Sequence, residues 1–194
     1  MIAALKTQKF TLSIKLREMG LPQYVIDAYS EELLEKLVKQ IPENPWKFYD
    51  KETGFSLKLC EKLAEKFSIN DELEKAKAYL QFSIDKVADE GHCYAKEWQI
   101  EKYLKKGNFS DYIKQQAIHY LQQENILFIS PKNNYFLSKY FNAEKNFAEL
   151  LKTLDKQNGY FSKFRKEYSF LYDDLNDAQK EVVDAVEYNK LIIL

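Results

Sequence analysis

Glycine and proline are scarce in this chain, with five glycines and four prolines among its 194 residues. Both residue types interrupt regular structure, so their scarcity leaves long stretches in which apolar residues recur every three to four positions. That spacing places the apolar side chains on one face of a helix. Aromatic residues make up 15% of the chain and supply material for a core. The sequence therefore predicts a mainly α fold in which each glycine or proline marks a turn.

Two of these turns divide the first part of the chain into similar halves. The first turn contains Gly20 and follows a helical pattern over residues 11–18. The second contains Gly54 and precedes an amphipathic pattern over residues 57–67. Glycine suits both places because it adopts backbone conformations that other residues avoid. Residues 11–69 are therefore predicted to hold two helix–turn–helix units of similar plan.

The order of elements changes after residue 70. Helical patterns follow between Asp71 and Gly91, over residues 98–104 and over residues 111–123. Two apolar segments then flank Pro-Lys-Asn-Asn, which predicts one small β-hairpin. Three helices followed by a hairpin is the order of a winged-helix domain. Residues 71–155, which end in a further helical pattern, are predicted to be a winged-helix-like domain.

The overall charge is nearly balanced, with 29 basic and 30 acidic residues and a net charge of −1. This balance by itself predicts no nucleic-acid partner, so any basic surface must be local. The two cysteines and two histidines lack zinc-ligand spacing. The chain starts without a signal pattern, and no apolar run approaches the length of a membrane span. We therefore expect a reduced, cytoplasmic protein without a metal site and without a membrane partner.

The last residues carry a distinctive order of patterns. Residues 156–174 are rich in aromatic and basic side chains, Leu-Asn-Asp-Ala-Gln over residues 175–179 opens a helix, and the apolar residues 191–194 are typical of a buried parallel strand. This order resembles the entry to the motor of RecD-like superfamily 1 DNA helicases, where the strand leads into the phosphate-binding Walker A loop. The resemblance implies that residues 156–194 are a connector and the first helix and strand of an ATPase motor, truncated before that loop. It also implies that Gln179 contacts the adenine of ATP in an intact parent protein.

Three earlier phrases resemble the amino-terminal region of the same family. Residues 44–48, Asn-Pro-Trp-Lys-Phe, are similar to the Asn-Pro-Tyr-x-Leu phrase that links two helix-hairpin-helix units. Residues 54–60 resemble the hairpin phrase Gly-Ile-Gly-Phe-Lys-Thr-Ala, and residues 88–94 resemble an Ala-Glu-Gly-His segment. With the motor entry, the resemblance covers residues 15–194. It implies that residues 1–70 form a tandem helix-hairpin-helix region.

The resemblance places DNA contacts on the hairpins. In a Gly–apolar–Gly hairpin, backbone N–H groups approach a phosphate, helped by the amino terminus of the next helix. The implied DNA-binding residues are Gly20, Gly54, Ser56 and Lys58. Ser56 departs from the pattern because it replaces the second glycine. Its hydroxyl would either donate a hydrogen bond to DNA or make this hairpin purely structural, and the sequence leaves both readings open.

The sequence offers further candidate DNA contacts besides the hairpin residues. Lys132 and Asn133 at the tip of the β-hairpin offer better phosphate contacts than the glutamine-rich helix over residues 111–123, which has one lysine. The aromatic and basic residues between 160 and 172 either stack unpaired bases or pack onto the preceding domain, and packing is favoured. Leu21 and Phe55 are predicted to be buried under their hairpins.

The resemblance implies an accessory DNA-binding region of an ATP-dependent, 5′-to-3′ DNA helicase of recombination and repair, or of the α chain of an exonuclease V-like enzyme. Single-stranded or forked DNA would be the partner, with helicase or nuclease subunits as further partners of a monomeric fragment. ATP and Mg²⁺ would belong to the full-length parent, because the fragment lacks the groups that hydrolyse ATP. Two alternatives remain, a free-standing winged-helix DNA-binding regulator and a protein-interaction module that docks a helicase to partners.

Overall fold

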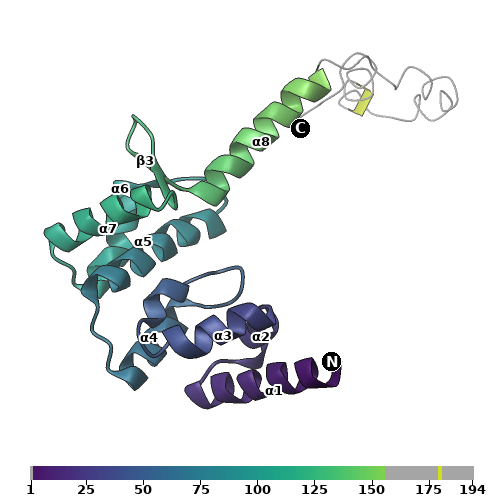
Figure 1. Ribbon diagram of the computed structural model, residues 1–194. Coiled ribbons are helices and arrows are strands. Elements are labelled where there is room, and N and C mark those ends of the chain that lie inside the picture. The colour runs from purple at the N-terminus through teal and green to yellow at the C-terminus, as the bar shows by residue number, and fades with distance from the viewer. Residues whose placement is uncertain (1, 156–178, 181–194) are drawn as a thin grey trace, which may run out of the picture. The chain divides into compact units, whose positions relative to one another are not determined.

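The computed structural model describes residues 2–155 and 179–180 (Figure 1). The chain divides into two compact units, Met1–Phe141 and Asn142–Leu194. Within the described residues, eight α-helices and one small antiparallel sheet confirm the predicted mainly α fold. The division into three domains at residues 70 and 155 stays a prediction.

The first elements form the predicted helix-hairpin-helix region, in the order α1 (Ile2–Met19), α2 (Gln23–Asp27), α3 (Glu31–Gln40), the 3₁₀ helix η1 (Pro45–Phe48) and α4 (Leu57–Phe67). The turn after α1 depends on Gly20, whose φ is +106°. The Gly20 N–H donates to the carbonyl oxygen of Arg17 at 2.8 Å, and the Leu21 N–H donates to that of Leu16 at 3.0 Å. This is a Schellman motif, in which a glycine ends a helix and an apolar pair closes the turn. Leu16 and Leu21 are that buried pair.

The Asn-Pro-Trp phrase connects the hairpin region to the next helix, α5 (Glu72–Asp89). Asn44 Oδ1 accepts a hydrogen bond from the Trp46 N–H at 3.2 Å, and Asn44 Nδ2 donates to Asp71 Oδ2 at 2.8 Å. Asp71 is the N-cap of α5, where its Oδ1 accepts from the Glu74 N–H at 3.0 Å. One buried asparagine therefore joins the caps of η1 and α5.

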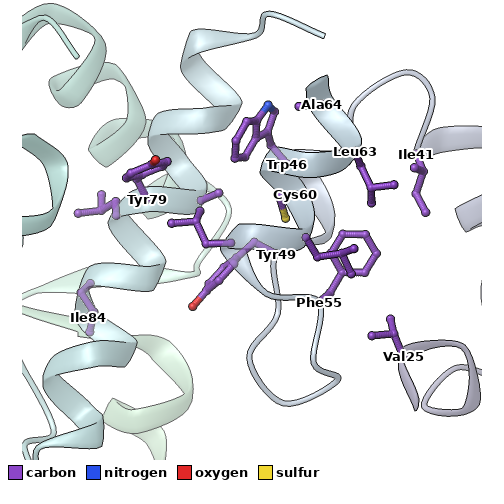
Figure 2. Close-up of a cluster of buried hydrophobic side chains, with 14 of the residues drawn as sticks. Val25, Ile41, Trp46, Tyr49, Phe55, Cys60, Leu63, Ala64, Tyr79 and Ile84 are labelled. Carbon is purple, nitrogen blue, oxygen red and sulfur yellow. The ribbon is translucent and has the colours of Figure 1, made fainter. Parts of the chain in front are cut away.

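Figure 2 shows buried side chains that run continuously from the hairpin region to α5. The Trp46 ring lies 6.5 Å from the Tyr79 ring of α5. Side chains of this core include Val25, Ile41, Trp46, Tyr49, Phe55, Cys60, Leu63, Ala64, Tyr79 and Ile84. The hairpin region and α5 consequently share one hydrophobic core.

The elements after α5 have the order of a winged helix: β1 (Ala95–Lys96), α6 (Glu97–Leu104), the 3₁₀ helix η2 (Lys105–Gly107), α7 (Asp111–Gln123), β2 (Leu127–Ile129) and β3 (Asn134–Leu137). The strand order is β1-β3-β2, with every neighbouring pair antiparallel. Ala95 pairs with Tyr135, and Leu127 pairs with Leu137. The β-hairpin β2–β3 confirms the predicted wing.

The structure also corrects several boundaries. Strand β1 was not predicted, because two residues are too short to show alternating polarity. Helix α1 begins at Ile2, well before the predicted start at residue 11, since Ile2-Ala-Ala-Leu5 contains good helix formers and no breaker. The two 3₁₀ helices were not predicted either.

The last described helix, α8 (Ser138–Asp155), starts in the first unit and continues into the second. The predicted connector over residues 156–174, the aromatic stripe within it and the strand over residues 191–194 lie outside the described residues. Gln179 and Lys180 are helical. None of the helices that the structure describes combines the length and apolar character needed to cross a membrane.

Candidate nucleic-acid interface

The first hairpin presents an exposed backbone turn. Gly20 is exposed, and Pro22 occupies the N-cap of α2 with extended backbone angles. The N–H groups of Gln23 and Tyr24, which begin α2, have no acceptor among the described residues. Unpaired N–H groups at the start of a helix can donate hydrogen bonds to an anion. Arg17 lies beside them and donates from Nε to Gln23 Oε1 at 2.5 Å.

The second hairpin is closed by a single β-bridge. The Asp50 N–H donates to the Phe55 carbonyl oxygen at 3.0 Å across this bridge. Gly54 has a φ of +79°, which a side chain would strain. The next turn is tight, because the Ser56 N–H donates to the Gly54 carbonyl oxygen at 2.8 Å. The backbone therefore turns sharply immediately before α4 begins.

Ser56 has a defined role in this turn. It is the N-cap of α4, and its Oγ accepts a hydrogen bond from the Leu59 N–H at 3.3 Å. An N-cap serine of this kind stabilises a helix by about 1 kcal/mol. Ser56 is an exposed residue, and its hydroxyl still has its own proton to donate. Serine at this position thus caps the helix and keeps a hydrogen-bond donor.

The two hairpins adjoin each other. A Cβ placed on Gly54 would lie 2.7 Å from Cε2 of Tyr24 and 3.7 Å from Cγ2 of Val25. The second hairpin therefore packs directly on α2, the helix that the first hairpin opens. The Tyr24 side chain is 63% exposed at this junction. Tyr24 was not predicted as a site residue, since only the spatial approach of Gly54 distinguishes it from other exposed tyrosines.

The apolar residue of each hairpin is buried, as the sequence predicts. Phe55 is 0% exposed and Leu21 is 4% exposed. The Phe55 ring packs 5.7 Å from the ring of Phe48 in η1. These side chains fix the turns from inside, so the exposed parts of both hairpins are backbone and polar groups.

Lysines near the second hairpin differ in their partners. Lys58, in the first turn of α4, is exposed and has no ion-pair partner among the described residues. Lys51 and Lys86 both pair with Asp89, and Lys86 Nζ lies 3.2 Å from Asp89 Oδ2. The hydrogen bond from Lys51, followed by that from Lys86, lowers the pKa of Asp89. Lys51 and Lys86 are therefore already neutralised in part, whereas Lys58 is not.

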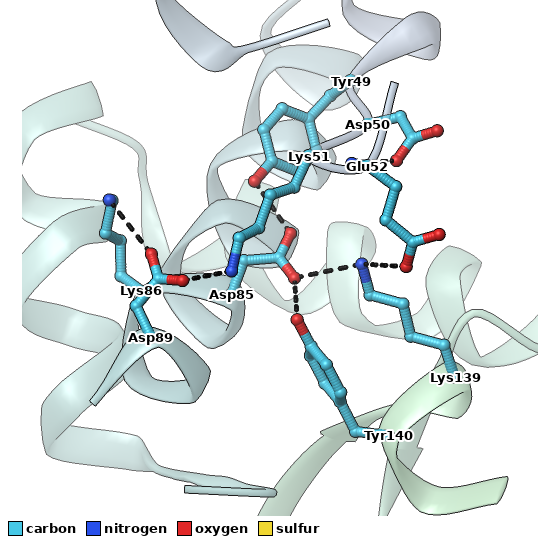
Figure 3. Close-up of polar contacts among 9 residues, drawn as sticks. All are labelled: Tyr49, Asp50, Lys51, Glu52, Asp85, Lys86, Asp89, Lys139 and Tyr140. Carbon is cyan, nitrogen blue, oxygen red and sulfur yellow. Dashed lines mark hydrogen bonds and ion pairs between the residues drawn. The ribbon is translucent and has the colours of Figure 1, made fainter. Parts of the chain in front are cut away.

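A buried carboxylate lies behind this hairpin (Figure 3). Asp85 of α5 is 2% exposed. It accepts hydrogen bonds from the Tyr49 hydroxyl at 2.8 Å and the Tyr140 hydroxyl at 2.7 Å. Lys139 Nζ lies 3.2 Å from Asp85 Oδ1 and 3.4 Å from Glu52 Oε1.

Burial, followed by the neighbouring Asp85, raises the pKa of both Tyr49 and Tyr140. Both phenols therefore remain protonated donors to the carboxylate. The Asp85 cluster (Tyr49, Glu52, Asp85, Lys139 and Tyr140) connects the loop of the second hairpin with α5 and the first turn of α8.

The wing tip is a separate location. Lys132 and Asn133 are exposed in the turn between β2 and β3, where Asn133 has a φ of +54° and donates its N–H to the Ser130 carbonyl oxygen at 2.9 Å. Figure 1 shows this β-hairpin well apart from α1 and α2. The structure places Gly54 against α2, the helix that follows Gly20, with Ser56 and Lys58 directly after it in sequence, and leaves the wing residues elsewhere.

Helix α7 occupies the position of a recognition helix but presents no unpaired cation. Its one lysine, Lys114, pairs with Glu101 Oε2 of α6 and with Asp111 Oδ1, each at 3.1 Å. Major-groove readers and phosphate contacts usually depend on free Arg or Lys side chains. The paired Lys114 therefore gives no support for base reading by this helix, and the preference for the wing tip stays a prediction.

Comparison with known families gives one match. Residues 6–94 match the family model described as the ATP-dependent RecD2 DNA helicase HHH domain. The matched segment contains both hairpins, the Asn-Pro-Trp phrase and the whole of α5. No curated protein matches the chain.

Proposed function

We propose that residues 6–94, which match the family model of the RecD2 DNA helicase HHH domain, bind the phosphates of duplex DNA through their two hairpins. The observation that carries this proposal is the packing of the Gly54 hairpin on α2, the helix that follows the Gly20 turn. Each turn precedes a helix whose first N–H groups have no acceptor among the described residues. Such groups are suited to phosphate oxygens.

The second hairpin offers the more complete phosphate site. The N–H groups of Leu57 and Lys58 have no acceptor in the described part of the chain, and the exposed residue Ser56 directly precedes them. The Lys58 side chain adds a positive charge in the same turn. Backbone, hydroxyl and ammonium donors within three consecutive residues match the oxygens of a phosphate.

The proposed contact is independent of base sequence. The exposed groups of both hairpins are backbone donors, a hydroxyl and a lysine, which recognise the sugar-phosphate backbone. The apolar residues Leu21 and Phe55 are buried and do not reach a groove. The net charge of −1 is compatible with this mode because the contact needs only local donors.

Lys58 tests the proposal directly. Replacing Lys58 with glutamine should weaken duplex binding several-fold at low salt, and should reduce the slope of log Kobs against log salt by about 1, because one phosphate contact is lost. The measurement is fluorescence anisotropy of labelled duplexes of two unrelated sequences, over a series of salt concentrations. Lys36→Gln, at an exposed position of α3, is the matched control.

The control variant should bind as the wild-type chain does, and both duplex sequences should respond equally to Lys58→Gln. An unchanged salt slope in Lys58→Gln would remove this residue from the interface. A change confined to one duplex sequence would mean that the region reads bases, contrary to the proposal.

In the parent enzyme this region would guide DNA to or from an ATP-dependent 5′-to-3′ motor, at single-stranded or forked substrates. Gln179, an exposed helical residue, would contact adenine there, and the groups that bind the phosphates and Mg²⁺ would come from the motor. Helicase or nuclease subunits would be its further partners. Lys132 and Asn133 would add phosphate contacts at the wing tip.

A further inference from the structure

The outer face of the small sheet carries a row of aromatic side chains. Phe128 of β2 pairs with Phe136 of β3, and their rings lie 6.0 Å apart. Tyr94 directly precedes β1, and its ring lies 5.4 Å from that of Phe136. The opposite face of the sheet, with Leu127 and Leu137, is buried in the core. One face of the sheet therefore builds the core, and the other presents aromatic rings.

A further aromatic ring packs against this face, and two of its rings remain partly exposed. Phe141, in the first turn of α8, lies 4.4 Å from Phe128 and 5.7 Å from Phe136, centroid to centroid. Phe136 is 8% exposed and serves as the base of the cluster. Tyr94 and Phe128 remain 37% and 38% exposed. We refer to Tyr94, Phe128, Phe136 and Phe141 as the wing face.

Two lysines lie beside the wing face. Lys96 Nζ lies 5.2 Å from the centroid of the Tyr94 ring and donates to Asn134 Oδ1 at 2.5 Å. Lys132 is exposed at the tip of the same hairpin. The three strands and the β2–β3 turn contain no Asp or Glu.

We propose that the wing face binds single-stranded DNA by stacking an unpaired base on Tyr94 and Phe128, with Lys96 and Lys132 near the backbone. Aromatic rings beside lysines are the combination with which proteins bind single-stranded nucleic acids. In a duplex the bases already stack on one another, so this surface suits unpaired bases and differs from the phosphate-binding hairpins. The inference rests on the proposal that the chain binds DNA, but it concerns another site and another form of DNA.

The test is a titration of the full chain with a labelled oligothymidylate of about 12 nucleotides, and in parallel with a duplex. Phe128→Leu keeps an apolar side chain but removes the aromatic plane. It should weaken oligothymidylate binding by about tenfold or more, in line with the loss of one stacked base, and leave duplex affinity unchanged. Phe128→Trp should restore binding. Trp98→Leu, which replaces a 69% exposed aromatic residue on α6, is the control and should have no effect.

Oligothymidylate binding by Phe128→Leu at wild-type strength would overturn the inference. So would an equal loss in the Trp98 control, which would point to nonspecific effects of exposed aromatics. If Phe128→Leu loses both ligands, photocrosslinking of the wild-type chain to oligodeoxybromouridine decides: a crosslink on Tyr94 or Phe128 supports the inference, and crosslinks confined to other residues overturn it. If the wild-type chain does not bind the duplex, that result would instead contradict the proposed function.

Discussion

Replacing Asp85 with alanine should lower the free energy of unfolding by about 2–4 kcal/mol, because it leaves buried donors without an acceptor. Two phenol hydroxyls, those of Tyr49 and Tyr140, donate to this carboxylate, and Lys139 pairs with it. Lys139 is partly exposed and can turn to water, so the two phenols account for most of the expected loss. Urea denaturation followed by circular dichroism measures the effect.

Asp89→Ala is the matched control, one helical turn further along α5. Asp89 also pairs with two groups, Lys51 and Lys86, but its side chain is 39% exposed. Exposed ion pairs contribute about 0–1 kcal/mol, so this variant should unfold almost as the wild type does. If the Asp85 variant lost no more stability than the Asp89 variant, the Asp85 cluster would not be a structural junction.

Phe55→Ala should be the most destabilising single truncation in the hairpin region, with a loss of about 3–5 kcal/mol. Phe55 is fully buried, packs on Phe48 and follows Gly54 directly, so its removal opens a cavity beneath the second hairpin. The same denaturation experiment measures this loss.

Phe10→Ala provides the comparison for Phe55, since Phe10 on α1 is 66% exposed. Truncation of an exposed side chain away from special features usually changes stability by less than about 0.5 kcal/mol. Equal losses in the two variants would mean that Phe55 does not support the hairpin as the structure shows.

The predictable parts of the fold depend on local chemistry. The bounds of α4 and α7 agree with the predicted residues 57–67 and 111–123, because apolar side chains of helical period occur between clear N-caps and stops. The turns at Gly20 and Gly54 were predictable because glycine adopts positive φ without strain, and both residues have positive φ in the structure.

The parts that were not predictable depend on contacts between distant segments. Asp85 lies on a helix, where an isolated aspartate is typical of an exposed face, and its partners Tyr49 and Tyr140 are 36 and 55 residues away in sequence. The approach of Gly54 to Tyr24 and the neutralisation of Lys114 by Glu101 are likewise properties of the packed structure. Strand β1 forms because β3 supplies a partner, and its two residues carry no pattern of their own.

The most direct test of the hairpin proposal is a salt titration of the wild-type chain with two duplexes of unrelated sequence. We expect equal affinity for both duplexes and a slope of log Kobs against log salt of about −2 to −3, as for two or three phosphate contacts. Affinity that is independent of salt, or no binding to either duplex at low salt, would contradict the proposal that the paired hairpins bind DNA phosphates.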